Sequence, residues 1–271
     1  MRGVYRFALR PRWILSHLLA LAVVVVCIGA GIWQLDRLDQ KRTAIDRYDE
    51  MSALPTVPVG DLLGPDTPED AVDELVHRRV SATGTYLVDE QVTVRNRTLD
   101  GAPGHWVLTP VLLDDGTAVV VNRGWVPMAV LEDLSTAAPP TGEVEVVGTL
   151  SATQERGTFG AVDAAEGRIV DFARADIGRL AAQIDVPVLP AYVTLEGQVP
   201  DTADVPVPVE PIEPDEGPHL GYAAQWFIFA AIAAVGYPLI LRKVARDRAA
   251  EAAADGAPRV RRRSAKVPVD D

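Results

Sequence analysis

The sequence of 271 residues is poor in the side chains that build metal and redox sites. Its one cysteine, Cys27, leaves no possibility of a disulfide framework within the chain and no Cys-x-x-Cys motif. A copper site would need Cys, Met and several His, but the chain has only three methionines and four histidines. The motifs of serine hydrolases, zinc proteases, P-loop NTPases and EF-hand proteins are all missing. We therefore expect neither an enzyme nor a copper-handling protein.

Acidic and basic residues are distributed unevenly. Residues 36–218 contain 33 acidic and 13 basic side chains, a net charge of −20, whereas the two ends together carry +8. A nucleic-acid-binding protein would need a basic face on its folded domain, so we expect no nucleic-acid partner. An acidic middle between basic ends is typical of a membrane protein with both ends in the cytoplasm. Of the 26 basic residues 23 are arginine, which is typical of a GC-rich bacterial genome.

Two apolar runs are long enough to cross a membrane, since about 20 helical residues span a hydrocarbon core of about 30 Å. We predict transmembrane helices at residues 13–35 and 219–241. Because Lys and Arg gather outside these runs, residues 1–12 and 242–271 are predicted to be cytoplasmic and 36–218 extracytoplasmic. Residues 242–271 are expected to form a disordered basic tail that is weakly attracted to anionic membrane lipid. A cleaved signal peptide is the alternative for the first run, and it would leave one anchor.

The middle of the chain changes its hydrophobic period to two after residue 79, and short β-rich runs alternate there with Gly, Pro and Asp clusters. This predicts an α+β domain dominated by antiparallel strands, with a tight hairpin around Asp115-Gly116. The first helix is expected to continue until Pro55. A second helix is expected to begin with Thr67 as its N-cap and Pro68 at its first position. The acidic, Pro-rich residues 199–218 are predicted to be a stiff tether that is not packed as a core element.

Polar and aromatic residues meet at the outer end of the two spans. The predicted site consists of His219, Tyr222, Gln225 and Trp226 from the second span with Trp33 and Gln34 from the first. On a helix, His219, Tyr222 and Trp226 fall on one stripe. One interpretation is an aromatic belt with an interhelical hydrogen bond. The other is a ligand site, because polar groups in a bilayer are costly and tend to mark function. Haem would fit, since one axial imidazole is enough.

The other three histidines are weaker candidates. His17 lies at the opposite end of the first span and is too far from His219 to share one ion with it. His77 is predicted to be a surface residue at a charged helix end. His105 precedes Trp106 on a strand and is predicted to be a core or surface residue rather than a ligand.

Five motifs, in order, resemble the surfeit locus protein 1 family of cytochrome c oxidase assembly proteins. They are GIWQLDRLDQK, GTYLVDEQVTVRNR, VVVNRGWVP, GEVEVVGTL and HLGYAAQWF, and they cover about residues 13–246. The resemblance implies a bacterial cell-membrane protein that assists haem a delivery or insertion into the catalytic subunit, without enzyme activity. It implies cytochrome c oxidase subunits and the haem a synthesis machinery as partners, and His219 as a transient ligand of the haem iron. In the NRGW motif we expect Gly124 to hold a turn. We expect Arg123 to pair with a carboxylate, either a haem propionate or a structural partner within the protein.

Three hypotheses follow. A haem-handling chaperone would bind haem between the two spans and would require His219. A membrane scaffold that binds no haem and stabilises an oxidase assembly intermediate would tolerate His219→Ala but not Val120→Asp in its strand core. An outer-surface sensor or envelope enzyme is disfavoured, because no catalytic constellation is present and the basic tail is too short for a signalling domain.

Overall fold

The structure is a computed structural model that describes residues 6–154, 156–157, 160–201, 205–211 and 213–255. The chain forms two compact units. One is helical and comprises Met1–Thr43 and Asp215–Asp271; the other comprises Ala44–Pro214 and is rich in β-strands. The predicted fold class is confirmed: two long apolar helices flank, in sequence, a β-rich domain.

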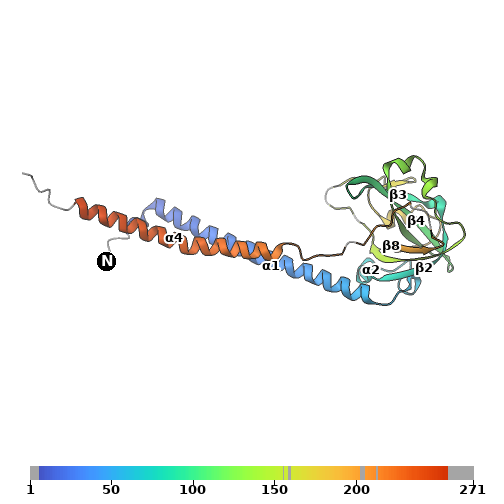
Figure 1. Cartoon of the computed structure of the whole chain (residues 1–271), viewed down its shortest axis with the longest axis horizontal. Coiled ribbons are helices and arrows are strands. Elements are labelled where there is room, and N and C mark those ends of the chain that lie inside the picture. Colours follow the sequence, from blue (N-terminus) through green and yellow to red (C-terminus); the bar gives the residue numbers. More distant parts are fainter. Residues whose placement is uncertain (1–5, 155, 158–159, 202–204, 212, 256–271) are drawn as a thin grey trace, which may run out of the picture. The chain divides into compact units, whose positions relative to one another are not determined.

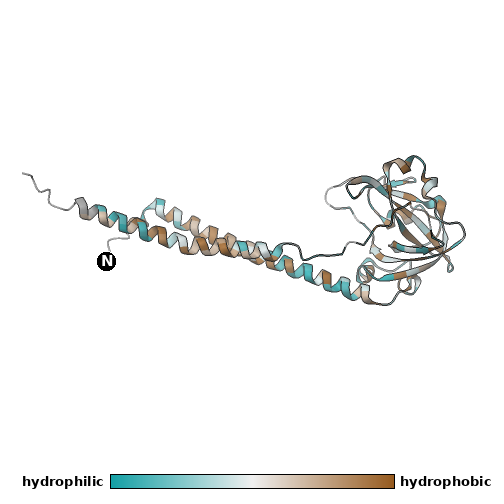
Figure 2. Ribbon diagram, in the orientation of Figure 1, coloured by the Kyte–Doolittle hydropathy of each residue, from teal (hydrophilic) through white to brown (hydrophobic). Residues whose placement is uncertain are grey.

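The helical unit contains a short 3₁₀ helix, η1 (Arg6–Leu9), and the helices α1 (Pro11–Ala53) and α4 (His219–Asp255). Both long helices contain a run that is long and apolar enough to cross a membrane. Large apolar side chains such as Leu19 and Ile232 are more than half exposed along these runs, and Figure 2 shows the apolar colour along both helices. A lipid environment accounts for such a continuous apolar surface. At about 1.5 Å per residue, the 43 residues of α1 exceed a bilayer core, as expected for a helix that continues towards Pro55.

The helices α1 and α4 pack antiparallel along one seam (Figure 1). Their buried and half-buried positions alternate at spacings of three and four, the heptad period that favours a left-handed supercoil. Small residues allow the backbones to approach closely. A Cβ on Gly31, for example, would lie 2.8 Å from two atoms of the Phe227 ring. The seam positions are Trp13, His17, Ala20, Val24, Cys27, Gly31, Gln34 and Leu38 of α1, and His219, Ala223, Trp226, Ala230, Ala233 and Tyr237 of α4.

The C-terminal part of α4 differs from the sequence prediction. A disordered tail was expected from residue 242, but the helix continues to Asp255. Two features account for this: residues 249–254 are mostly alanine, the strongest helix former, and the preceding turns still pack against the other helical segments. Ala245 is buried, and the Arg248 guanidinium lies 4.5 Å from the centre of the Phe7 ring. Residues 256–271 lie outside the described part of the chain.

The β-rich unit is built on a closed barrel. Its sheet order is β1-β2-β6-β8-β5-β4-β3-β7, and an additional pairing of β2 with β4 closes five strands into a ring. Only β5 and β8 pair in parallel within the ring, so antiparallel pairing dominates as predicted. The order is of the Greek-key kind found in small five-stranded barrels such as OB folds. The strands are β1 (Val57–Pro58), β2 (Arg79–Tyr86), β3 (Val92–Leu99), β4 (Ala102–Leu113), β5 (Ala118–Pro127), β6 (Glu143–Ala152), β7 (Asp171–Phe172) and β8 (Val188–Val199).

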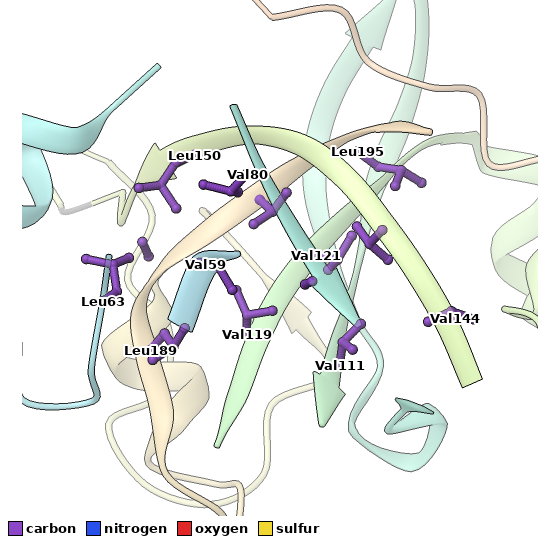
Figure 3. Packing of buried hydrophobic residues seen from close by; sticks show 14 of the residues in the cluster. Val59, Leu63, Val80, Val111, Val119, Val121, Val144, Leu150, Leu189 and Leu195 are labelled. Carbon is purple, nitrogen blue, oxygen red and sulfur yellow. The ribbon is translucent and has the colours of Figure 1, made fainter. Parts of the chain in front are cut away.

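Strand β5 is buried on both faces. Val119 and Val121 point into the barrel, where side chains from all five ring strands pack together (Figure 3). Val120 points outward into a second cluster that α3 (Ile177–Ala181) covers with Ile177 and Leu180. The short helix α3 thus interrupts the run of strands and closes this outer cluster. The remaining short helices are α2 (Glu69–Leu75), η2 (Val59–Asp61), η3 (Val88–Glu90), η4 (Met128–Glu132) and η5 (Leu134–Ala137).

The predicted start of α2 is wrong by one residue. Pro68 has extended backbone angles and precedes the first helical residue, Glu69, so it occupies the N-cap position that was assigned to Thr67. The Thr67 hydroxyl instead accepts a hydrogen bond of 2.9 Å from the backbone amide of Gly64. Thr67 thus closes the turn before the helix and does not cap it.

The predicted tether is wrong in part, because it packs on the barrel. Residues 205–207, which we call the docked segment, exchange two backbone hydrogen bonds between Val207 and Trp125, of 2.7 and 2.8 Å. Pro206 is buried, and Val205 packs against Val107 and Val126. Alternating valines favour extended structure, and their free backbone groups extend the pairing at the end of β5. Residues 202–204 and 212 of the predicted tether lie outside the described residues.

Gly124 does not hold the turn that was expected. It lies within β5 at φ +134°, next to a bulge at which the pairing with β4 skips Arg123. A Cβ at Gly124 would lie 2.3 Å from the Val207 carbonyl oxygen. Glycine is therefore required there by the close approach of the docked segment.

Candidate functional site

His219 is held by Gln34 across the helix seam. The distance between His219 Nδ1 and Gln34 Oε1 is 2.7 Å. An amide oxygen only accepts, so His219 Nδ1 carries the proton that is donated to Gln34. Nε2 takes no part in this hydrogen bond. The His219 side chain has no other hydrogen bond within the described part of the chain. The pair thus presents a half-buried imidazole whose Nε2 makes no hydrogen bond among the described residues and faces a potential ligand.

Gly217 forms the turn that precedes His219. Its φ is +62°, and a Cβ built on it would lie 3.4 Å from Cδ2 and 3.5 Å from Nε2 of His219, an ordinary van der Waals contact. A side chain at this position would be strained because of the positive φ. The prediction missed Gly217, although a glycine two residues before His219 is a visible signal in the sequence.

Three of the other predicted site residues, Tyr222, Gln225 and Trp33, do not lie between the helices. Trp226 is half-buried in the seam and packs edge-to-face with Phe229 at 6.0 Å, whereas Tyr222 and Trp33 are 49% and 59% exposed. Gln225 is also exposed. At this level the seam is closed by Ala223 and by the Gly31–Phe227 contact, so a macrocycle has no space between the spans. Three of the predicted residues therefore face outward rather than into the seam, and the haem site itself stays a prediction.

The exposed residues share one flank of the helix pair. Trp33, Tyr222 and Gln225 each directly precede a seam residue, and successive helical residues are turned by about 100°. In an antiparallel pair, the residues that precede seam positions on the two helices project to the same side. We call Trp33, Tyr222 and Gln225 the polar-aromatic flank. His219 thus stands at the edge of an exposed flank, at the first residue of α4.

A second polar cluster occupies the opposite end of the helix pair. The Tyr237 hydroxyl lies 2.6 Å from His17 Nδ1 and 2.6 Å from the Ser16 hydroxyl. His17 Nε2 donates to the backbone carbonyl of Ala8 at 3.1 Å, so both ring nitrogens are used. His17 is 17 residues from Gln34 on one helix, or about 25 Å. This agrees with the prediction that His17 and His219 cannot share one ion.

Arg123 is enclosed within the β-rich unit. It is 1% exposed, and its Nη1 donates to the backbone carbonyl of Ala137 at 2.7 Å and to Gln91 Oε1 at 3.2 Å. Its guanidinium lies 5.4 Å from the centre of the Tyr86 ring, and it forms no ion pair among the described residues. The expected carboxylate pairing is therefore wrong among the described residues, where Nε and Nη2 of this buried guanidinium have no hydrogen-bond partner. Burial lowers the pKa of Arg123, but an arginine remains charged at neutral pH.

The β-rich unit has its own pocket of about 200 Å³ beside β5. Trp106 and Tyr192 form walls, and residues 209–211 line the rim. Asn122 is 1% exposed, its Oδ1 accepts from the Gly124 amide, and its Nδ2 has no partner among the described residues. The pocket therefore offers a hydrogen-bond donor and an aromatic wall to a small group from outside the domain.

The two remaining histidines lie in the β-rich unit. His77 also lines this pocket and packs edge-to-face on Tyr48, so it is half-buried rather than a free surface residue, and burial lowers its pKa. His105 is 8% exposed in β4, which confirms a core position, and its Nε2 lies 3.5 Å from Asp171.

Comparison with known proteins identifies relatives along most of the chain. The model of the SURF1 family matches residues 21–231, a range that contains both Gln34 and His219. A SURF1-like protein of Mycobacterium tuberculosis is 30% identical over 235 residues, which are 85% of this chain and 83% of that protein. A SURF1-like protein of Rickettsia felis is 20% identical over 84% of this chain and 98% of its own. The cytochrome oxidase assembly protein SHY1 of Saccharomyces cerevisiae is 30% identical over 109 residues, 40% of this chain and 27% of the yeast protein.

Proposed function

The chain belongs to the SURF1 family, and from this premise we propose that it assists the assembly of a haem-copper cytochrome c oxidase. The similarity to a yeast cytochrome oxidase assembly protein supports an assembly role, and the two candidate spans support action at a membrane. The surplus of Arg and Lys outside the spans supports a bacterial cell-membrane location with cytoplasmic termini and an extracytoplasmic barrel. The proposed partners are oxidase subunits and the enzymes that make haem a.

The specific task that we propose is to hold haem a, as cargo, on its way to the catalytic subunit. The observation that carries this proposal is the hydrogen bond from His219 Nδ1 to Gln34. Histidines that bind a metal usually donate their other ring N–H to an oxygen, which fixes the tautomer and the orientation of the ring. Gln34 does this for His219 and leaves Nε2 as the ligand atom.

The surroundings of His219 suit an amphiphilic, flat cargo. His219 opens the second span and so lies at the predicted boundary between lipid and water. The polar-aromatic flank offers the faces of Trp33 and Tyr222 on the lipid side of the helix pair, where the tail of haem a could remain in the bilayer. One imidazole leaves the second axial position of the iron open for transfer to another protein. A single ligand on an exposed flank therefore favours transient holding.

This proposal is tested by replacing His219 in a strain that depends on the protein for oxidase assembly. We expect His219→Ala to accumulate in the membrane at the parent level, while the haem a content of the purified oxidase falls by tenfold or more. His17→Ala is the matched control, because it removes a half-buried histidine from the same helix pair at the opposite end. Normal haem a content with His219→Ala would contradict haem holding at this residue.

The alternative is a scaffold that binds an oxidase assembly intermediate without holding haem. The pocket beside β5 favours it, because the buried Nδ2 of Asn122 lacks an acceptor that a partner's carbonyl or carboxylate could supply. Asn122→Asp keeps the acceptor for Gly124 but removes this donor. If the scaffold reading holds, Asn122→Asp reduces recovery of oxidase subunits with the protein, while His219→Ala does not. Val120→Asp, at a fully buried position, should abolish both functions by unfolding the domain.

A further inference from the structure

A groove opens on the surface of the helix pair near the end that carries η1. It measures about 270 Å³ and lies between α1 and α4. Its walls are apolar, and the His17–Tyr237 hydrogen bond lies at its margin. The lining residues are His17, Ala20, Leu21, Val24, Ala233, Ala234, Tyr237 and Pro238. All of them fall within the segments that we assign to the membrane, so the groove faces lipid.

An uncompensated basic cluster lies immediately beyond this groove. Because the helices are antiparallel, the N-terminal end of α1 and the continuation of α4 past residue 241 lie at the same end of the pair. The exposed cations there are Arg10, Arg12, Arg242, Lys243 and Arg246. None of them forms an ion pair with a carboxylate in the described part of the chain. Only Asp247 and Glu251 bring negative charge to this end between residues 237 and 251.

The basic cluster is aligned with the apolar groove on α4. Arg242 follows Pro238 by four residues, so it lies one helical turn beyond the groove on the same face of α4. Arg10 lies in the bend that precedes α1, seven residues before His17. Pro238 has no backbone N–H to donate to the carbonyl of Ala234, and both residues line the groove. This end of the helix pair therefore combines an apolar groove, a backbone carbonyl that lacks its usual helical donor, and positive charge.

We propose that this groove is a binding site for one anionic phospholipid. Its acyl chain lies along Leu21 and Ala234, and its phosphate is bound by the basic cluster that includes Arg242. Basic pockets between transmembrane helices select anionic headgroups, and each Lys or Arg contributes roughly a fivefold preference. A zwitterionic lipid would bring its own ammonium group next to these cations and would bind less well. A free phosphate would leave the apolar groove empty.

The test uses the full-length protein in nanodiscs that contain phosphatidylglycerol and phosphatidylcholine with identical acyl chains, followed by native mass spectrometry. We expect one phosphatidylglycerol to be retained in preference to phosphatidylcholine. Arg242→Gln should lower that preference about fivefold. The matched control is Arg37→Gln, which removes the same charge from an exposed position towards the other end of α1 and should not change it.

A second pair of variants tests the groove without changing charge. Ala234 is exposed, so Ala234→Trp should fill the groove and release the retained lipid without disturbing the seam. Ala224→Trp, at an exposed position of α4 outside the groove, should leave retention unchanged. Helix content by circular dichroism verifies that each variant is folded. Equal retention of the two lipids, or retention that Arg242→Gln and Ala234→Trp leave intact, means annular lipid only and overturns the proposal.

Discussion

Replacing Gly124 with alanine should detach the docked segment from the barrel. The new Cβ would lie 2.3 Å from the Val207 carbonyl oxygen and 2.8 Å from its carbonyl carbon, so the backbone must move. Two backbone hydrogen bonds between Val207 and Trp125 would then be lost, each worth about 1 kcal/mol. Alanine at φ +134° adds strain of about 1–3 kcal/mol. These two effects together should destabilise the docked state of the segment by about 3–5 kcal/mol relative to the parent.

Hydrogen exchange of the full-length protein in detergent measures this effect directly. A loss of the two hydrogen bonds alone, about 2 kcal/mol, should accelerate exchange of the Val207 amide about 30-fold. The matched control is Gly142→Ala, since Gly142 also has a positive φ, +85°, but a Cβ there would meet no atom within 4 Å. That variant should cost about 1 kcal/mol and leave Val207 protected. If the Val207 amide of Gly124→Ala exchanges at a rate within threefold of the rate in the parent, the role assigned to Gly124 is refuted.

Three further predictions concern single side chains. Gln34→Leu should reduce haem a affinity about 10- to 100-fold by freeing the His219 imidazole, measured by haem titration; unchanged affinity would show that Gln34 does not orient it. Gly217→Ala should weaken haem binding while leaving helix content constant, because alanine at φ +62° would strain the turn that precedes His219; binding as in the parent would show that this turn does not position the imidazole. Burial raises the pKa of Tyr86 to about 12, although Arg123 opposes part of the rise, so the neutral phenol is favoured in the folded state. Stability from this group is therefore complete below pH 10 and is lost as the pH rises from 10 to 12, by about 1.4 kcal/mol per unit. Urea midpoints of the parent and Tyr86→Phe, compared from pH 8 to 11, should diverge only above pH 10, and parallel curves would contradict this burial effect.

The regular elements were predictable because their signals are local. Period-two runs placed the barrel strands, and apolar length placed the spans in α1 and α4. Closure of the barrel was not predictable, because it depends on Tyr86 of β2 pairing with Val111 of β4 while β3 lies between these strands in the sequence, which no local pattern encodes. The continuation of α4 was missed because charge was given more weight than alanine content.

The candidate site residues were placed at one level of the helix pair from the sequence, but the helix faces on which they lie were not predicted. His219 and Gln34 meet as their shared membrane depth suggested. The stripe of His219, Tyr222 and Trp226 was one choice among neighbouring faces of a helix, and the structure uses Ala223 instead of Tyr222. The small side chains of Ala223 and Ala230 permit the two helices to pack closely. Tyr222 directly precedes Ala223 and therefore points about 100° away from the seam. Arg123 was misassigned although the alternation of Val119 and Val121 on the inward face of β5 already places it on that face.

The central claim is that His219 holds haem a through Nε2. Its most direct test is the visible absorption spectrum of the detergent-purified protein, produced together with a haem a supply, beside its His219→Ala variant. The account predicts a haem a band in the parent that disappears in the variant. A band of equal intensity in both proteins, or none in either when the protein is folded and haem a is present, would contradict it and favour the scaffold.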